Sequence, residues 1–217
     1  VVNLGITSKN LLKSEIYEFL VFYYYNKRKR TELRFYNEEL QKICSVTEVM
    51  NQYNNKTEKL LFEIRKRYSD FYLMNLEWYS NNYKKIDTKN IEKIYSLAKE
   101  GNFSYYIFKS LHHRVIHAIT GNKPEAAGEL CIEGYYKAKE LENIPVTYLF
   151  LSILYYLRTI IHVPKIRLSY DEITNYYRRA KKTIPLNQWT VFLENAISMI
   201  HYPEIVNKAP EMLLAQA

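Results

Sequence analysis

The stretch that decides the fold is IEKIYSLAKEGNFSYYIFKS, residues 91–110, because much of it returns as CIEGYYKAKELENIPVTYLFLS at residues 131–152. Both stretches carry the pattern Tyr-x-x-Ala-Lys, and a third copy spans residues 177–181. Phenylalanines recur between these copies at a spacing of 42, at Phe108, Phe150 and Phe192. Two helix types therefore alternate along the chain. This pattern predicts stacked helical hairpins, since a single hairpin cannot bury its apolar face alone.

The composition of the 217-residue chain agrees with an all-α fold. No Gly or Pro occurs between Gly5 and Gly101, whereas a β-sandwich or barrel needs turn residues roughly every 8–12 positions. Apolar residues make up 47% of the chain and aromatic residues 15%, which argues against disorder. The predicted helices span residues 9–26, 31–44, 46–54, 57–84, 88–100, 104–119, 124–142, 146–161, 170–182 and 187–201, with 57–84 forming one helix or two.

Several helix starts have recognisable signals. Ser45-x-x-Glu48 and Ser169-x-x-Glu172 fit the capping box, Asp87 can cap the helix that begins at Thr88, and Pro124 is placed in a first turn. We expect an N-terminal helical region at 1–86, a repeat region at 87–202 and a C-terminal tail at 203–217.

The repeat resembles a degenerate tetratricopeptide repeat (TPR). Ile173, Tyr177, Ala180 and Pro185 follow the spacing of the second helix of that family, although its Trp and Gly are absent and the period is 40–42 residues. This resemblance implies a right-handed array of stacked antiparallel helical hairpins, here preceded by an N-terminal helical bundle.

Tyr-, Phe- and Lys-rich arrays of this kind are also similar to the C-terminal domains of the RRNPP family, bacterial and phage regulators that bind short signalling peptides. The opening Leu4-Gly5-Ile6-Thr7-Ser8-x-x-Leu11-Leu12 resembles the last helix of the DNA-binding domain that precedes such arrays. Because the chain begins with Val1, we expect it to be the regulatory part of a longer protein. Residues 1–86 would then serve as a linker or for dimerisation.

These resemblances imply a non-enzymatic recognition domain, which binds a peptide or protein and belongs to a transcriptional regulator. First helices of such arrays line the concave face, where polar side chains bond an extended peptide. The predicted peptide-binding residues are Lys109, His112, His113, Tyr155, Arg158 and Asn195.

The net charge of +8 leaves a second function open, namely nucleic-acid binding. Basic residues interleaved with aromatic ones can hold phosphates and stack bases. The candidates are Lys27, Arg28, Lys29, Arg30, Arg65, Arg67, Arg178 and Arg179. A third possibility is a protein-assembly scaffold, and a homodimer is compatible with each of the three.

The sequence offers no pattern for catalysis or for a cofactor. Nucleophile elbows and phosphate-binding glycine loops are absent, and no carboxylate joins His113 and His117 at a metal-binding spacing. A helical nuclease would need Arg158 and His162 to converge across a dimer. Cys44 and Cys131 are expected to be buried free thiols, which fits a cytoplasmic protein. No apolar run is long enough for membrane insertion.

Overall fold

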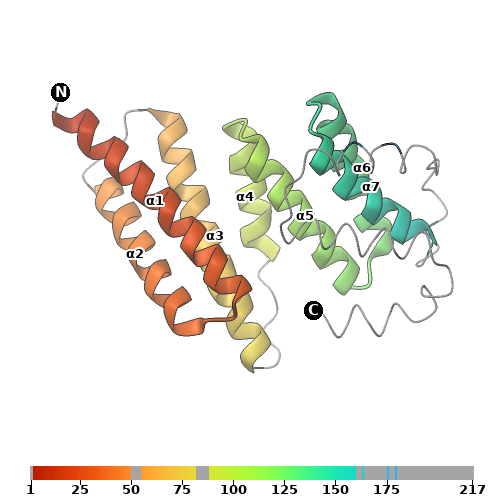
Figure 1. Ribbon diagram of the computed structural model, residues 1–217, viewed down its shortest axis with the longest axis horizontal. Helices are drawn as coiled ribbons and strands as arrows, with labels where there is room; N and C mark the ends of the chain where they lie inside the picture. Colours follow the sequence, from red (N-terminus) through yellow and green to blue (C-terminus); the bar gives the residue numbers. More distant parts are fainter. Residues whose placement is uncertain are drawn as a thin grey trace. The chain divides into compact units, whose positions relative to one another are not determined.

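A computed structural model describes residues 2–49, 55–81 and 88–159 and the single positions Val163, Asn175 and Arg179. Within these residues every regular element is a helix and no strand occurs, which confirms the all-α prediction (Figure 1). None of these helices is both long enough and apolar enough to cross a membrane. The helices are α1 (Val2–Asn26), α2 (Arg30–Val49), α3 (Lys56–Asn81), α4 (Thr88–Glu100), α5 (Ser104–Thr120), α6 (Pro124–Glu140) and α7 (Ile144–Thr159).

The predicted break at Ser45 is wrong, because α2 runs through it. The buried residues of α2 continue in a helical spacing from Leu40 through Cys44 to Thr47, and neither Gly nor Pro interrupts them. Burial of this face favours a continuous helix over a new helix start at Ser45. Pro124, in contrast, occupies the first turn of α6 as predicted. The predicted helices 170–182 and 187–201 and the cap at Asp87 lie outside the described residues.

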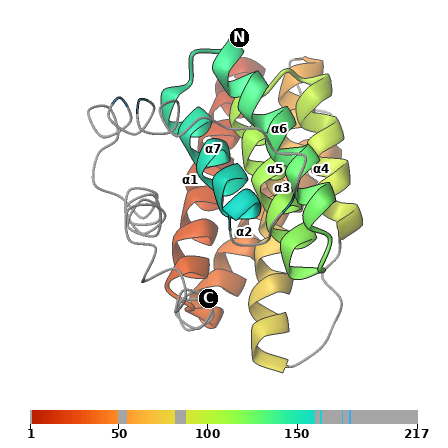
Figure 2. The same ribbon diagram turned by 90° about the vertical axis from the view of Figure 1, so that its right-hand side faces the viewer.

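The chain divides into two compact units, Val1–Ser110 and Leu111–Ala217. In the first unit α1, α2 and α3 pack against one another, and α4 packs against α3 (Figure 1). In the second unit α6 packs along α7 (Figure 2). The division falls within α5, whereas the boundary expected at residue 86 lies in a segment outside the described residues.

Aromatic side chains dominate the core of the first unit. Phe62, Tyr68 and Tyr72 of α3 are fully buried, and Phe62 packs with Leu40 and Cys44 of α2. Cys44 and Cys131 are both buried and free, as predicted. Burial raises the pKa of the Cys44 thiol to about 12, so this thiol is not reactive at neutral pH.

One type of turn joins four pairs of helices. The second residue after each helix has a positive φ, at Arg28, Asn102, Asn122 and Glu142. In the turn after α4, the amide of Phe103 donates to the carbonyl of Ala98 (2.9 Å), and that of Asn102 donates to Lys99 (3.2 Å). The same bonds recur after α1, α5 and α6, and they cap the last carbonyls of each helix. From α4 onward these turns recur every 20 residues, with the positive φ at Asn102, Asn122 and Glu142.

The two described copies of Tyr-x-x-Ala-Lys have matching environments. Ala98 and Ala138 are fully buried. The lysine of each motif contacts the tyrosine one turn earlier. Lys99 Nζ lies 5.2 Å from the centre of the Tyr95 ring, and Lys139 Nζ lies 5.3 Å from that of Tyr135 and donates to the Tyr135 hydroxyl at 3.1 Å. The motif thus combines one small residue for packing with a lysine–tyrosine contact.

The intervening helices also match each other. Phe108 and Phe150 are buried, and the hydroxyls of Ser110 and Ser152 each donate to the carbonyl four residues earlier, at 2.7 and 2.8 Å. Gly134 is required for the contact between α6 and α7, because a Cβ there would lie 2.5 Å from the Phe150 ring. The third copy of the repeat lies outside the described residues.

Candidate functional site

A buried polar cluster joins α1, α3 and α5 within the first unit. Its centre is Glu18 of α1, whose side chain is 8% exposed. Lys109 Nζ lies 2.9 Å from one carboxylate oxygen. The Tyr106 hydroxyl donates to the other at 2.6 Å, and Arg65 Nε lies 3.5 Å from that oxygen. The charges of this cluster are therefore satisfied inside the protein.

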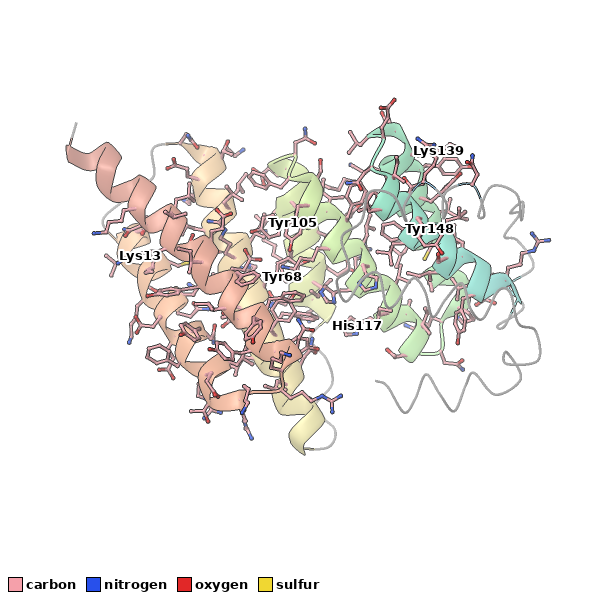
Figure 3. The ribbon with its side chains drawn as sticks, in the orientation of Figure 1. Lys13, Tyr68, Tyr105, His117, Lys139 and Tyr148 are labelled. Carbon is pink, nitrogen blue, oxygen red and sulfur yellow. The ribbon has the colours of Figure 1, made fainter. Side chains whose placement is uncertain are left out.

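Aromatic rings surround the Lys109 ammonium. Burial by itself lowers the pKa of Lys109, but the neighbouring tyrosines and the Glu18 carboxylate outweigh it and raise the pKa well above its usual value. Lys109 is consequently protonated at neutral pH and cannot act as a base. The distances from Nζ to the ring centres are 4.3 Å for Tyr68, 5.1 Å for Tyr105, 5.4 Å for Tyr72, 5.6 Å for Phe22 and 5.7 Å for Tyr106 (Tyr68 and Tyr105 are labelled in Figure 3).

Arg65 is directed into the same cluster. Its guanidinium donates to the Leu11 carbonyl (2.9 Å) and the Ser14 hydroxyl (2.7 Å), and it pairs with Glu15 at 3.2 Å. The Arg65 side chain is only 7% exposed. These contacts connect α3 to α1. Lys109 and Arg65, predicted to bind peptide and nucleic acid respectively, thus both have internal partners.

The other predicted nucleic-acid residues differ in environment. Arg67 pairs with Glu63 at 2.6 Å and donates to Asn90 at 3.2 Å. The run Lys27–Arg30 is exposed at the turn between α1 and α2, and Arg30 lines an open pocket with Arg34 and Phe35. Arg179 is exposed and Arg178 lies outside the described residues.

The predicted histidines occupy adjacent positions on α5. His112 and His113 are partly buried, with ring centres 5.8 Å apart. Burial lowers the pKa of His112 to about 4, so its ring is neutral at pH 7. Burial also lowers the pKa of His117. Among the described residues no three His, Cys, Asp or Glu side chains are grouped to hold a metal ion.

The remaining predicted peptide-binding residues belong to later segments. Arg158 is exposed near the end of α7, and Tyr155 belongs to the same helix. The side chain of Tyr155 and the whole of Asn195 lie outside what the structure describes.

A surface on α1 that was not predicted from the sequence consists of Leu12, Ile16, Phe19 and Tyr23, and we name it the α1 stripe. These residues follow one another at spacings of four, three and four, so they form one continuous face of the helix. Their exposed fractions are 59%, 47%, 63% and 44%. Together they form an exposed, mainly apolar face of on the order of a few hundred Å², comparable to the largest apolar patch on a typical monomeric protein. Patches of this size are often functional.

The opposite face of α1 packs inside the unit. Ser14, Glu18 and Val21 are buried there and lie about 180° from the α1 stripe around the helix. The bundle therefore covers this mixed face of the helix and leaves the apolar α1 stripe exposed.

Comparison of the chain with protein-family models, with curated proteins and with solved structures found no match in any of the three.

Proposed function

We propose that this protein is a non-enzymatic recognition domain that binds a peptide or protein partner. The α1 stripe is the observation that carries this proposal. A face of three helical turns with four large apolar side chains is exposed, and helical domains bind amphipathic segments through faces of this kind. The aromatic residues Phe19 and Tyr23 are of the type that supplies most binding energy at interfaces.

The proposal also covers how the helices from α4 onward are arranged. We infer that the helices from α4 onward form a TPR-like right-handed array that continues through the third motif copy at 177–181. The matching burial of the two described copies and the turns 20 residues apart support this inference. The similarity to RRNPP regulators supports a role as the peptide-responsive part of a transcriptional regulator.

Selection from a displayed library of random peptides against the full chain tests the proposed function. We expect a family of related sequences with micromolar or tighter affinity. A selection that yields no related sequences after several rounds, with the chain shown to be folded by circular dichroism, would contradict a recognition function.

Nucleic-acid binding is a second candidate, favoured by the exposed run Lys27–Arg30 beside the exposed Phe35 and Tyr23. Basic and aromatic side chains in one place can hold phosphates and stack bases. The test is binding of labelled duplex and single-stranded DNA and RNA across a salt series. Affinity that falls steeply with salt would support this function, and the absence of binding at low salt would exclude it.

A further inference from the structure

We propose that the α1 stripe binds an acidic amphipathic helix of a partner protein. This inference rests on the proposed function and specifies its partner. The apolar spacing of the stripe calls for a helix, because residues at intervals of four and three along one helix meet the same spacing on another. From Leu12 to Tyr23 the stripe is about 17 Å long, which is about three turns of a partner helix.

The charges beside the stripe define the partner as acidic. The only acidic residues of α1 are Glu15, whose side chain is 66% exposed, and the buried Glu18, and both form ion pairs with Arg65. Lys9 and Lys13 are exposed toward the N-terminal end of the helix (Lys13 is labelled in Figure 3). Because Arg65 and Lys109 balance the charges of Glu15 and Glu18, the two lysines leave this end of the stripe with a net positive charge.

The positive charge increases beyond the other end of the stripe. Five of the eight residues 27–34 are basic and one is acidic, and Lys27–Arg30 are all exposed. The turn is continuous with the stripe, because Lys27 Nζ lies 5.9 Å from the centre of the Tyr23 ring. An apolar stripe with basic residues at both ends complements a helix that has leucine or phenylalanine on one face and Glu or Asp along its edges.

The test uses the full chain and a fluorescent peptide of about 18 residues, long enough for three turns with acidic flanks. Its apolar residues have the four–three spacing and its flanks are Glu. One control peptide has the same composition with the spacing scrambled, and another has Lys in place of Glu. We expect the acidic amphipathic peptide to bind most tightly, with an affinity that decreases as salt is added.

Phe19→Ser and Tyr136→Ser form a matched pair of variants, since the two residues are 63% and 64% exposed. Phe19→Ser should weaken binding by at least about tenfold, whereas Tyr136→Ser on α6 should change it by less than about twofold. The double variant Lys27→Gln/Lys29→Gln should weaken binding severalfold and reduce its salt dependence. Equal melting temperatures of the variants and the wild type establish that folding is unchanged.

Four results would overturn the proposal. The first is equal binding by Phe19→Ser and the wild type, and the second is equal binding of the Lys peptide. The third is a dimer in light scattering that Phe19→Ser dissociates, because a second copy would then cover the stripe. The fourth is binding of nucleic acid but no peptide, lost in Lys27→Gln/Lys29→Gln. If displayed peptides are selected but bind Phe19→Ser as tightly as the wild type, the proposed recognition function holds and the α1 stripe is not the binding surface. If no peptides are selected, both proposals fail.

Discussion

The pairing of Lys109 with Glu18 makes a strong prediction about stability. Lys109→Met keeps the aliphatic stem against the aromatic rings and removes the ammonium. The Glu18 carboxylate then remains 8% exposed with only the Tyr106 hydroxyl at 2.6 Å and Arg65 at 3.5 Å. Breaking a buried ion pair costs about 3–5 kcal/mol, and these two remaining partners offset part of it. We therefore expect a loss of about 2–4 kcal/mol in the free energy of unfolding.

Glu18→Gln should cost a similar amount, because it leaves the Lys109 ammonium buried with ring contacts worth about 2 kcal/mol. The double variant should be less destabilised than the sum of the two, with a coupling energy of at least about 1.5 kcal/mol. Urea unfolding followed by far-ultraviolet circular dichroism measures all three values, provided that the slope with denaturant is unchanged.

Lys139→Met is the matched control. Lys139 also lies over a tyrosine ring, at 5.3 Å from the centre of Tyr135, but Lys139 is exposed. We expect a change within about 0.5 kcal/mol. If Lys109→Met were as mild as this control, or if the effects at positions 18 and 109 were additive, the cluster would not be a desolvated ion pair.

Three further predictions concern single positions. Partial burial lowers the pKa of His112 to about 4 in the folded state, so the unfolded state binds more protons below pH 6.5. Stability should therefore fall by roughly 2–3 kcal/mol between pH 6.5 and pH 4. Thermal unfolding of His112→Gln should lack this part of the pH dependence, and an unchanged profile would contradict a neutral ring at this position. Gly134→Ala places a Cβ 2.5 Å from the buried Phe150 ring. Overpacking should cost about 1–3 kcal/mol and exceed the gain of about 1 kcal/mol in helix propensity, so urea unfolding should show net destabilisation. Net stabilisation would refute the close packing of α6 on α7. Ala138→Asp should lower the free energy of unfolding by on the order of several kcal/mol in the same assay, because Ala138 is fully buried. Tyr136→Asp, at an exposed position, should change it little. If Ala138→Asp left the free energy of unfolding unchanged, the alignment of the repeat would be refuted.

Periodicity and turn residues predicted the all-α fold well. Gly101-Asn102 and Gly121-Asn122 lie in turns of the type that ends a helix with a residue of positive φ, and such residues are readable in a sequence. The break at Ser45 failed because a capping box is a local signal, which the buried face of α2 overrides.

The exposure of the α1 stripe was harder to predict, for a physical reason. The sequence of α1 has apolar residues on two faces, and either could have packed against the bundle. Which face is buried depends on partners far along the chain, such as Arg65 and Lys109 at Glu18. The internal pairing of Lys109 was equally hard to foresee, because its Glu18 partner is 91 residues away in sequence. Position within a predicted array does not reveal such a pair.

Hydrogen exchange of the full chain, with and without a selected peptide, tests recognition through α1. Mass spectrometry resolves the exchange by segment. If the peptide binds the α1 stripe, amides in residues 9–30 exchange more slowly when it is bound, and exchange in α6 and α7 does not change. Protection confined to α6 or α7, with residues 9–30 unchanged, would contradict recognition through α1.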